Sequence, residues 1–353
     1  MLAGVFRHRG AFAFATAVAS SLLVHDAAAW PATQQDVAWC VNTGNAYPPD
    51  MRIAGCTAVI ESGQWSGHQL IWAYVNRGLA HAAKGDPRAL ADFSEAIRIE
   101  PQQLRALFER GRFYAGVIDD PDRALQDFDA AIAADPRFID ALIYRGGIRR
   151  RNGDYDGAIR DFTASLAVTD DARIHLARGG AYRAKGDYAH AVEDYEEALT
   201  LVPGRIALVE ARAEANFSMA RYEAAAADFS RVLDFDAGSG AAALWLYLSR
   251  ARAGEEAAAA ADLAARAPKL RQPEWPFAAV ALFLGRGSEE AALAAATRPN
   301  ERCEARIFVG EWHLLRGDAA AASQSFKSMD ADCPKFFIDY HELAAAERKR
   351  LER

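Results

Sequence analysis

Apolar residues recur every three to four positions along most of the chain, in stretches separated by short turns that contain Gly, Asp or Pro. This spacing places the apolar side chains on one face and predicts amphipathic α-helices. The helices come in pairs, and the pairs repeat: four stretches align with one another and a fifth is more divergent, at 76–101, 109–136, 144–170, 177–203 and 211–237. The hydrophobic pattern therefore predicts an all-α fold of repeated helix pairs.

Each copy keeps the same landmark residues. A small residue on the first helix recurs at intervals of 33, 35, 33 and 34 residues, at Gly78, Gly111, Gly146, Gly179 and Ala213. An aromatic residue on the second helix is expected to fill the groove between neighbouring units, at Phe93, Phe128, Phe162, Tyr195 and Phe229. Proline stops the second helix at Pro101, Pro136 and Pro203. A sixth copy, 301–336, keeps these offsets after a gap.

These landmarks resemble the tetratricopeptide repeat, a pair of antiparallel helices that stacks into a right-handed superhelix. The resemblance covers 69–237 and implies an α-α superhelix, a solenoid in which each unit contacts mainly its neighbours. We expect one continuous array without a flexible linker. Its parts are a divergent, disulfide-stapled helix pair (30–68), five repeat units (69–237), two atypical helix pairs (238–300), and a last unit with a capping helix (301–353).

A second pattern pairs opposite charges within each unit. Arginine precedes the small landmark residue in all five copies, and aspartate precedes the aromatic residue 15 to 17 positions later: Arg77 with Asp92, Arg110 with Asp127, Arg145 with Asp161, Arg178 with Asp194, and Arg212 with Asp228. This offset places the two charges on facing helices, so we predict a ladder of structural ion pairs. The alternative is a row of arginines that binds an acidic ligand.

The N-terminus predicts export. Residues 1–29 contain a short basic head, an apolar stretch and the small-residue end Ala27-Ala28-Ala29, which are typical of a signal peptide cleaved after Ala29. The apolar stretch is too short to cross a bilayer, so a retained membrane anchor is the weaker interpretation. We therefore expect a periplasmic protein.

All four cysteines lie beyond the predicted cleavage point, and an even number in an exported chain predicts disulfides. Cys303 and Cys333 mark the open end of one helix pair, and Cys40 and Cys56 mark the ends of the N-terminal pair. We expect the bridges Cys303–Cys333 and Cys40–Cys56. A zinc site is a poor alternative because the sequence has no close cysteine pair.

The net charge and the missing motifs argue against nucleic-acid binding and enzyme activity. A formal net charge of −7 gives no reason to expect nucleic acid as a partner. The stretch beginning His341-Glu342 lacks the second histidine of a zinc motif, because position 345 is Ala, and neither a phosphate-binding loop nor a serine nucleophile motif is present. We expect no enzyme activity, no catalytic residue, no cofactor and no metal.

The resemblance implies that ligands bind on the concave surface, which the first helix of each pair lines. Positions counted from the landmark residue give a candidate peptide-binding groove of Trp72, Leu79, Arg105, Phe108, Arg112, Arg150, Arg173 and Arg183. Such a groove suits a peptide with acidic residues or a free carboxylate. The alternative is that these side chains are solvated or contact adjacent repeats.

The segment 240–351 is also similar to NlpI-type periplasmic repeat proteins, through LWLYLSRARAG (244–254), WPFAAVALFLG (275–285) and the stretch beginning CEARIFVGEW at 303. That resemblance implies a non-enzymatic adaptor that brings cell-wall hydrolases and proteases together, and a possible homodimer. The family's lipid-accepting cysteine is missing, so membrane tethering does not follow. Two alternatives stay open: a structural part of an outer-membrane or secretion assembly, and an enzyme subunit with an unrecognised site in 239–297.

Overall fold

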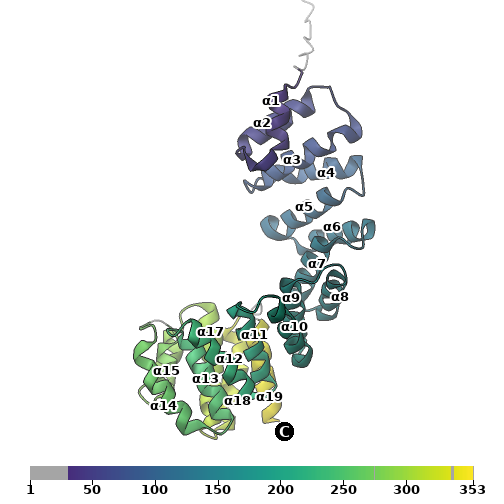
Figure 1. The fold of residues 1–353 in the computed structure, drawn as a ribbon. Helices are drawn as coiled ribbons and strands as arrows, with labels where there is room; N and C mark the ends of the chain where they lie inside the picture. Colours follow the sequence, from purple (N-terminus) through teal and green to yellow (C-terminus); the bar gives the residue numbers. More distant parts are fainter. Residues whose placement is uncertain (1–30, 274, 335–337, 353) are drawn as a thin grey trace, which may run out of the picture.

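The computed structural model describes residues 31–273, 275–334 and 338–352. The predicted signal peptide, 1–29, therefore lies outside the described residues. Within those residues the structure contains nineteen α-helices and no strand. The prediction of an all-α superhelix is confirmed, and Figure 1 shows the purple and blue helices of the N-terminal part stacked in chain order.

The first helix pair, α1 (Gln34–Val41) and α2 (Pro49–Glu61), is joined by the disulfide Cys40–Cys56. Both sulfurs lie in a small core. Five regular units follow: α3 (Ile71–Ala82) with α4 (Arg88–Ile99), α5 (Leu104–Phe113) with α6 (Pro121–Ala134), α7 (Ile139–Arg151) with α8 (Tyr155–Leu166), α9 (Ala172–Ala184) with α10 (Tyr188–Leu201), and α11 (Ile206–Ser218) with α12 (Tyr222–Phe235). In the second unit a π-helical turn, η3 (Tyr114–Ile118), extends α5.

The landmark residues behave as contact points between paired helices. A Cβ atom added to Gly78 would lie 2.6 Å from the ring of Phe93, and one added to Gly146 would lie 2.9 Å from the ring of Phe162. Neither gap accepts a larger residue, because carbon atoms in contact prefer about 3.5–4.0 Å. Asp120, Asp154 and Asp187 each cap the following helix by accepting a backbone N–H bond, which explains where these second helices begin.

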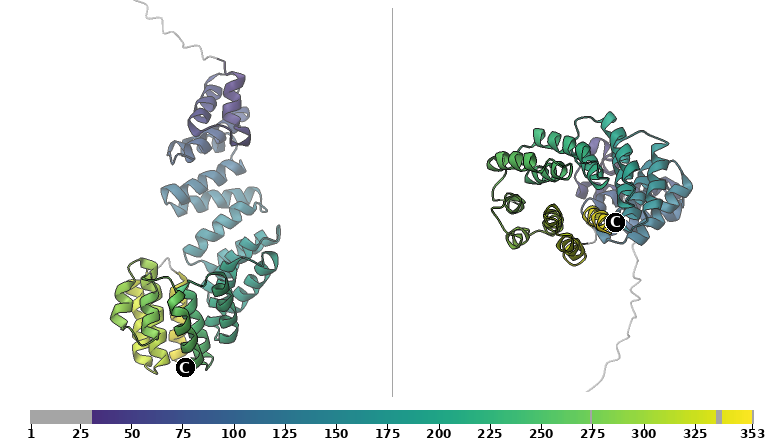
Figure 2. Two further views of the ribbon diagram at one scale, coloured as in Figure 1. Left: turned by 60° about the vertical axis from the view of Figure 1, so that its left-hand side comes forward. Right: turned by 90° about the horizontal axis from the view of Figure 1, so that it is seen from below.

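The C-terminal helices are α13 (Gly240–Arg252), α14 (Glu256–Arg266), α15 (Phe277–Phe283), α16 (Glu289–Ala295), α17 (Pro299–Leu315), α18 (Ala319–Asp332) and α19 (Ile338–Leu351). The disulfide Cys303–Cys333 joins α17 to the end of α18. Figure 2 shows that the helices from α11 onward curl into a compact ring, whereas α1 to α10 form an elongated stack. α19 closes the ring, because it packs against α17 and α18 and also against α9 and α11.

Each of the five arginines in the ladder is paired with the aspartate of its own unit. The Nη2–Oδ1 distances are 2.7, 2.6, 2.6, 2.7 and 2.7 Å for Arg77–Asp92, Arg110–Asp127, Arg145–Asp161, Arg178–Asp194 and Arg212–Asp228. All five aspartates are buried. These arginines are therefore held between helices and do not form a row that faces an acidic ligand.

The same arginines also reach the preceding unit. The Nη1 atom of Arg110 donates to Ser94 at 2.9 Å, and Nη1 of Arg145 donates to Asp129 at 2.6 Å. Arg77 and Arg178 make the corresponding bonds to Thr57 and Thr163 at 3.1 Å. One guanidinium fork thus joins three helices, which ties successive units together as well as the two helices of one unit.

A buried charge cluster holds α19 in the ring. Glu347 of α19 and Glu311 of α17 are both 0 % exposed. Arg252 of α13 lies 3.2 Å from Glu347 and 3.7 Å from Glu311, and it also donates to the Tyr222 hydroxyl at 2.9 Å. Burial, reinforced by the neighbouring Glu347 charge, raises the pKa of Glu311 to about 8.

Candidate functional site

Two adjoining cavities form a groove on the first helices of the repeat units. One has a volume of about 480 Å³ and lies on η3, α5 and α7, and the other has a volume of about 380 Å³ and lies between α7, α9 and α11. Ile143, Gly147 and Arg150 of α7 line both cavities. The two therefore form one continuous surface, which we call the basic groove.

The charge of the basic groove is entirely positive. Its lining includes five arginines and no carboxylate: Arg112, Arg150, Arg151, Arg173 and Arg183. Three of these cations have an acidic partner outside the lining. Arg112 lies 3.0 Å from Glu109 and Arg173 lies 2.6 Å from Asp171, whereas Arg183 is ion-paired with Glu214. Even with these partners, cations outnumber anions at a surface within an acidic chain.

Arg150 is the central cation of the groove. Among the residues that the structure describes, its guanidinium has no hydrogen-bond or ion-pair partner. Beside it, Gly147 and Gly180 occupy the interiors of α7 and α9, and an added Cβ at either position would meet nothing within 4 Å. Mid-helix glycine is less stable than alanine by about 0.5–1 kcal/mol, and here no packing contact requires it. The open floor instead suits close approach by another chain.

The structure brings together four of the eight residues predicted for the peptide groove: Arg112, Arg150, Arg173 and Arg183. The prediction for Phe108 is wrong. Its ring is 8 % exposed and packs in an aromatic core, 5.9 Å from the ring of Phe128 and 5.3 Å from that of Phe138. The counting rule took a core position of α5 for a groove position.

The other three predicted residues lie outside the lining of the two cavities. Trp72 and Leu79 of α3 are half-buried and pack against the apolar clusters of the first units. Arg105 is exposed on α5. Conversely, the sequence-based list omitted Gly147, Gly180 and Arg151. The consecutive glycines at 146–147 and 179–180 were the available signal, since only the first glycine of each pair is needed for helix contact.

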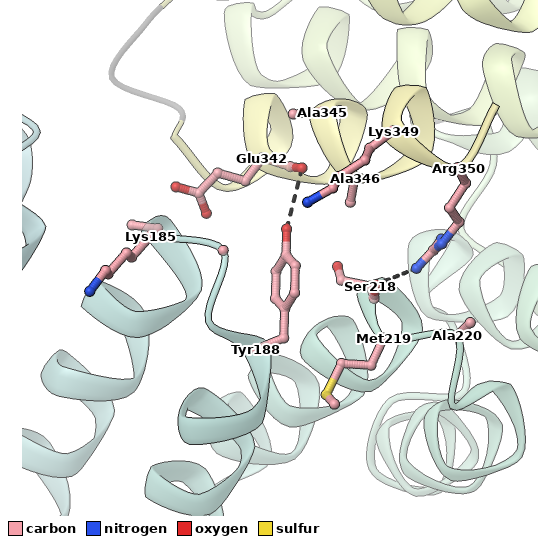
Figure 3. Close-up of a pocket in the computed structure, with 12 residues that line it drawn as sticks. Lys185, Tyr188, Ser218, Met219, Ala220, Glu342, Ala345, Ala346, Lys349 and Arg350 are labelled. Atoms are coloured by element: carbon pink, nitrogen blue, oxygen red, sulfur yellow. Dashed lines mark hydrogen bonds between the residues drawn. The ribbon is translucent and has the colours of Figure 1, made fainter. Parts of the chain in front are cut away.

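A separate cavity of about 560 Å³ lies where α19 meets α9 and α11 (Figure 3). The Tyr188 hydroxyl donates to the backbone oxygen of Glu342 at 3.4 Å, and Arg350 donates to the backbone oxygen of Ser218. Arg183 and Tyr188 also line a smaller cavity of about 100 Å³ that adjoins the basic groove. α19 therefore stands at the end of the groove.

Buried carboxylates near the ring have structural partners. Glu304 accepts a hydrogen bond from Trp275 at 2.7 Å, and burial raises its pKa to about 7. Glu304, Glu311 and Glu347 line none of the cavities described above. Among the described residues, no group of His, Cys, Asp and Glu side chains is placed to hold a metal ion. Within the residues that the structure describes, no helix is long and apolar enough to cross a membrane.

Comparison with known families agrees with this architecture. Residues 117–169 and 146–206 match the family model described as tetratricopeptide repeat. This part of the chain, which carries most of the basic groove, is therefore made of tetratricopeptide repeats, as the landmarks predicted. No curated protein gives a significant match to the chain.

Several solved structures are similar to parts of this chain, each with a TM-score below 0.5. A tetratricopeptide repeat protein from Parabacteroides merdae ATCC 43184 is 15 % identical, with a TM-score of 0.45, over 90 % of this chain and 100 % of that one. YrrB, described as a TPR protein with an unusual peptide-binding site, is 16 % identical over 55 % and 97 %, with a TM-score of 0.48. MamA from Desulfovibrio magneticus RS-1 is 24 % identical over 46 % and 93 %, with a TM-score of 0.44. The resemblance to NlpI-type proteins is not confirmed by these comparisons.

Proposed function

We propose that this chain is a non-enzymatic scaffold of the cell envelope whose basic groove binds an acidic segment of a protein partner. The observation that carries the proposal is the lining of the groove, with five arginines and no carboxylate in a chain of net charge −7. Arginine forks bind carboxylates in a bidentate manner, so a segment rich in Asp or Glu is the complementary ligand. The open floor at Gly147 and Gly180 leaves room for its backbone.

The envelope assignment rests on different features. The sequence of 1–29 is typical of a signal peptide, and both cysteine pairs are disulfide-bonded. Disulfides persist in oxidising compartments such as the periplasm and are rare in the cytosol. Cell fractionation with mass spectrometry of the isolated protein tests this assignment: we expect a periplasmic protein that begins at Trp30, and a full-length cytosolic protein would contradict it.

The binding role is tested by cross-linking capture in the native envelope followed by mass spectrometry. The critical variant is Arg150→Glu, which reverses the unpaired central cation. The matched control is Arg160→Glu, an exposed arginine on α8 outside the groove lining. We expect the captured proteins to be the same for the unmodified chain and the control, and to be lost with Arg150→Glu.

Salt provides an independent check of the same site. Exposed charges farther apart than about 8 Å are largely screened at physiological ionic strength, so binding through arginines weakens as salt is added. We expect capture to fall steeply between low and high salt. Capture that survives both Arg150→Glu and high salt would show that a surface other than the basic groove binds the partner.

A structural role in a larger envelope assembly is the second candidate, and one observation favours it. Leu201 and Val202 at the end of α10, and Phe235 at the end of α12, are exposed apolar residues on consecutive units, with Phe235 74 % exposed. Exposed apolar side chains at the same place in consecutive units would form a protein contact if they lie side by side. Sedimentation of the purified chain tests this candidate: self-association, or a homodimer, that disappears with Phe235→Ser supports it, and a monomer at all concentrations counts against self-assembly through this surface.

A further inference from the structure

The turn between α5 and α6 is one residue longer than the corresponding turns. Nine positions separate the landmark Gly111 from the capping Asp120, whereas eight separate Gly146 from Asp154 and eight separate Gly179 from Asp187. The extra residue is accommodated in the π-helical turn η3, which ends at Asp119 with φ of 59°. Single π-turns within helices occur frequently at functional sites.

This insertion exposes two branched apolar side chains. Val117 is 50 % exposed and Ile118 is 39 % exposed. The residue before the left-handed position of the turn is Lys84, Asn152 or Lys185 in other units, but Ile118 here. Among the first four units, the second therefore differs from the others, because it has an exposed apolar residue where they have a polar one.

The two exposed apolar residues directly follow residues that line the basic groove. Ala115 and Gly116, which immediately precede Val117, line the cavity on α5 and α7 together with Tyr144. The Tyr144 ring is 41 % exposed, and the Arg112 guanidinium lies 5.4 Å from its centre. Apolar and cationic surfaces thus meet at one edge of the groove. We call Val117, Ile118 and Tyr144 the apolar rim.

We propose that the apolar rim is the second half of the partner site, and that the bound segment carries an aromatic or branched aliphatic residue next to its acidic residues. The inference rests on the proposed function, because it specifies the partner of the same groove. Buried apolar anchors contribute much of the affinity of protein interfaces, whereas complementary charges mainly select the partner and its orientation. The rim and the groove supply these two contributions side by side.

An anionic bilayer is a weaker match to this surface. Its headgroups form a broad convex or flat surface, whereas Arg150 and Arg173 line a concave groove on α7 and α9, the first helices of two consecutive units. A single protein segment can contact the groove and the apolar rim together.

The test is a selection of random peptides displayed on phage against the full chain. We expect the enriched sequences to contain two or more acidic residues with an aromatic or branched aliphatic residue close by. A synthetic peptide with this consensus is then titrated by fluorescence anisotropy against the unmodified chain and its variants. The double variant Val117→Ser, Ile118→Ser should bind about ten-fold more weakly, as expected for loss of an interface anchor.

Two further variants control for folding and for general apolar surface. Val41→Ser removes an exposed branched side chain at the end of α1, outside the groove lining, and should leave the affinity unchanged. Ile118→Asn introduces the residue that the third unit has at the same turn position, Asn152, so it keeps a turn that this fold accepts. It should weaken binding while leaving the circular dichroism spectrum unchanged.

The possible results separate the two proposals. Acidic consensus peptides that lack an apolar residue and bind the double variant normally would overturn the apolar rim and leave the basic groove standing. A selection that enriches no acidic peptide, or peptides that bind Arg150→Glu normally, would overturn both. Binding of phosphatidylglycerol vesicles that is lost in the double variant, without peptide binding, would assign the rim to a membrane and overturn the inference.

Discussion

We expect the stability of the C-terminal ring to depend on pH, and we expect replacing Glu311 with Gln to remove much of that dependence. Glu311 is completely buried on α17, and neither carboxylate oxygen has a hydrogen-bond partner among the described residues. Its neighbours are Arg252 of α13, at 3.7 Å, and the charges of Glu347 and Arg350 on α19. Burial, reinforced by the Glu347 charge, raises its pKa from 4.5 to about 8.

The sign follows from the proton that the folded state retains. The unfolded chain releases this proton above about pH 4.5, whereas the folded chain holds it up to about pH 8. The ionisation of Glu311 therefore lowers stability: its unfavourable contribution is absent at acidic pH and grows as the pH rises between these values, by about 1.4 kcal/mol per pH unit. Because Glu347 shares the site and titrates with Glu311, we expect a loss of about 2–4 kcal/mol between pH 5 and pH 8.

Urea unfolding at pH 5, 6, 7 and 8, with hydrogen exchange of α17 and α19 measured by mass spectrometry, tests this expectation. The Gln variant should match the unmodified chain at pH 5 and be more stable at pH 8. Glu223→Gln, an exposed glutamate at the start of α12, is the matched control and should show no pH-dependent difference. An equal difference at pH 5 and pH 8 for Glu311→Gln would refute the reasoning, because it would show that Glu311 ionises normally.

Two further predictions concern a buried ion pair and a disulfide that stabilise the fold. Asp161→Asn leaves Arg145 and Arg149 without their buried acceptor, and urea titration should show a free energy of unfolding about 3 kcal/mol lower. Asp129 is an exposed partner of the same arginines, so Asp129→Asn should lower the free energy of unfolding by less than about 1 kcal/mol. Cys303→Ser with Cys333→Ser opens a loop of 30 residues and should cost about 3–4 kcal/mol, with the loss in thermal melts confined to the C-terminal ring. A loss in this double variant that extends to the melting of α1 to α10 would contradict the prediction.

Local periodicity was sufficient to predict the helix pairs. The landmark glycines and aromatic residues recur at fixed offsets, and each offset corresponds to one contact between two antiparallel helices. The same offsets give the separation of the Arg–Asp pairs, but they do not show the bond from Nη1 of Arg110 to Ser94 of the preceding unit. That bond depends on how consecutive units stack.

Other features are not visible in the repeat pattern. Phe108 and Arg112 lie four positions apart on the same face of α5, and the Arg112 guanidinium is 5.6 Å from the centre of the Phe108 ring. Phe108 is buried because Phe138 and Tyr144 of the next unit pack against it, whereas Arg112 stays in the groove lining. The return of α19 to α9 and α11 joins residues more than 130 positions apart, as in the bond from Arg350 to Ser218. Contacts at such separation leave no periodic trace in a single sequence.

The return of α19 also changes how the array should unfold. In an open solenoid each unit touches only its neighbours, so the ends fray and structure is lost step by step. Here the last helix is fastened to the fourth and fifth units, so α11 to α18 form a closed loop that has no free end. We expect the C-terminal half to unfold in one cooperative step, and the first three units to melt gradually from the side of α1. If the last residues were pulled, the largest force would be needed to detach α19, and no repeat unit would unfold before that.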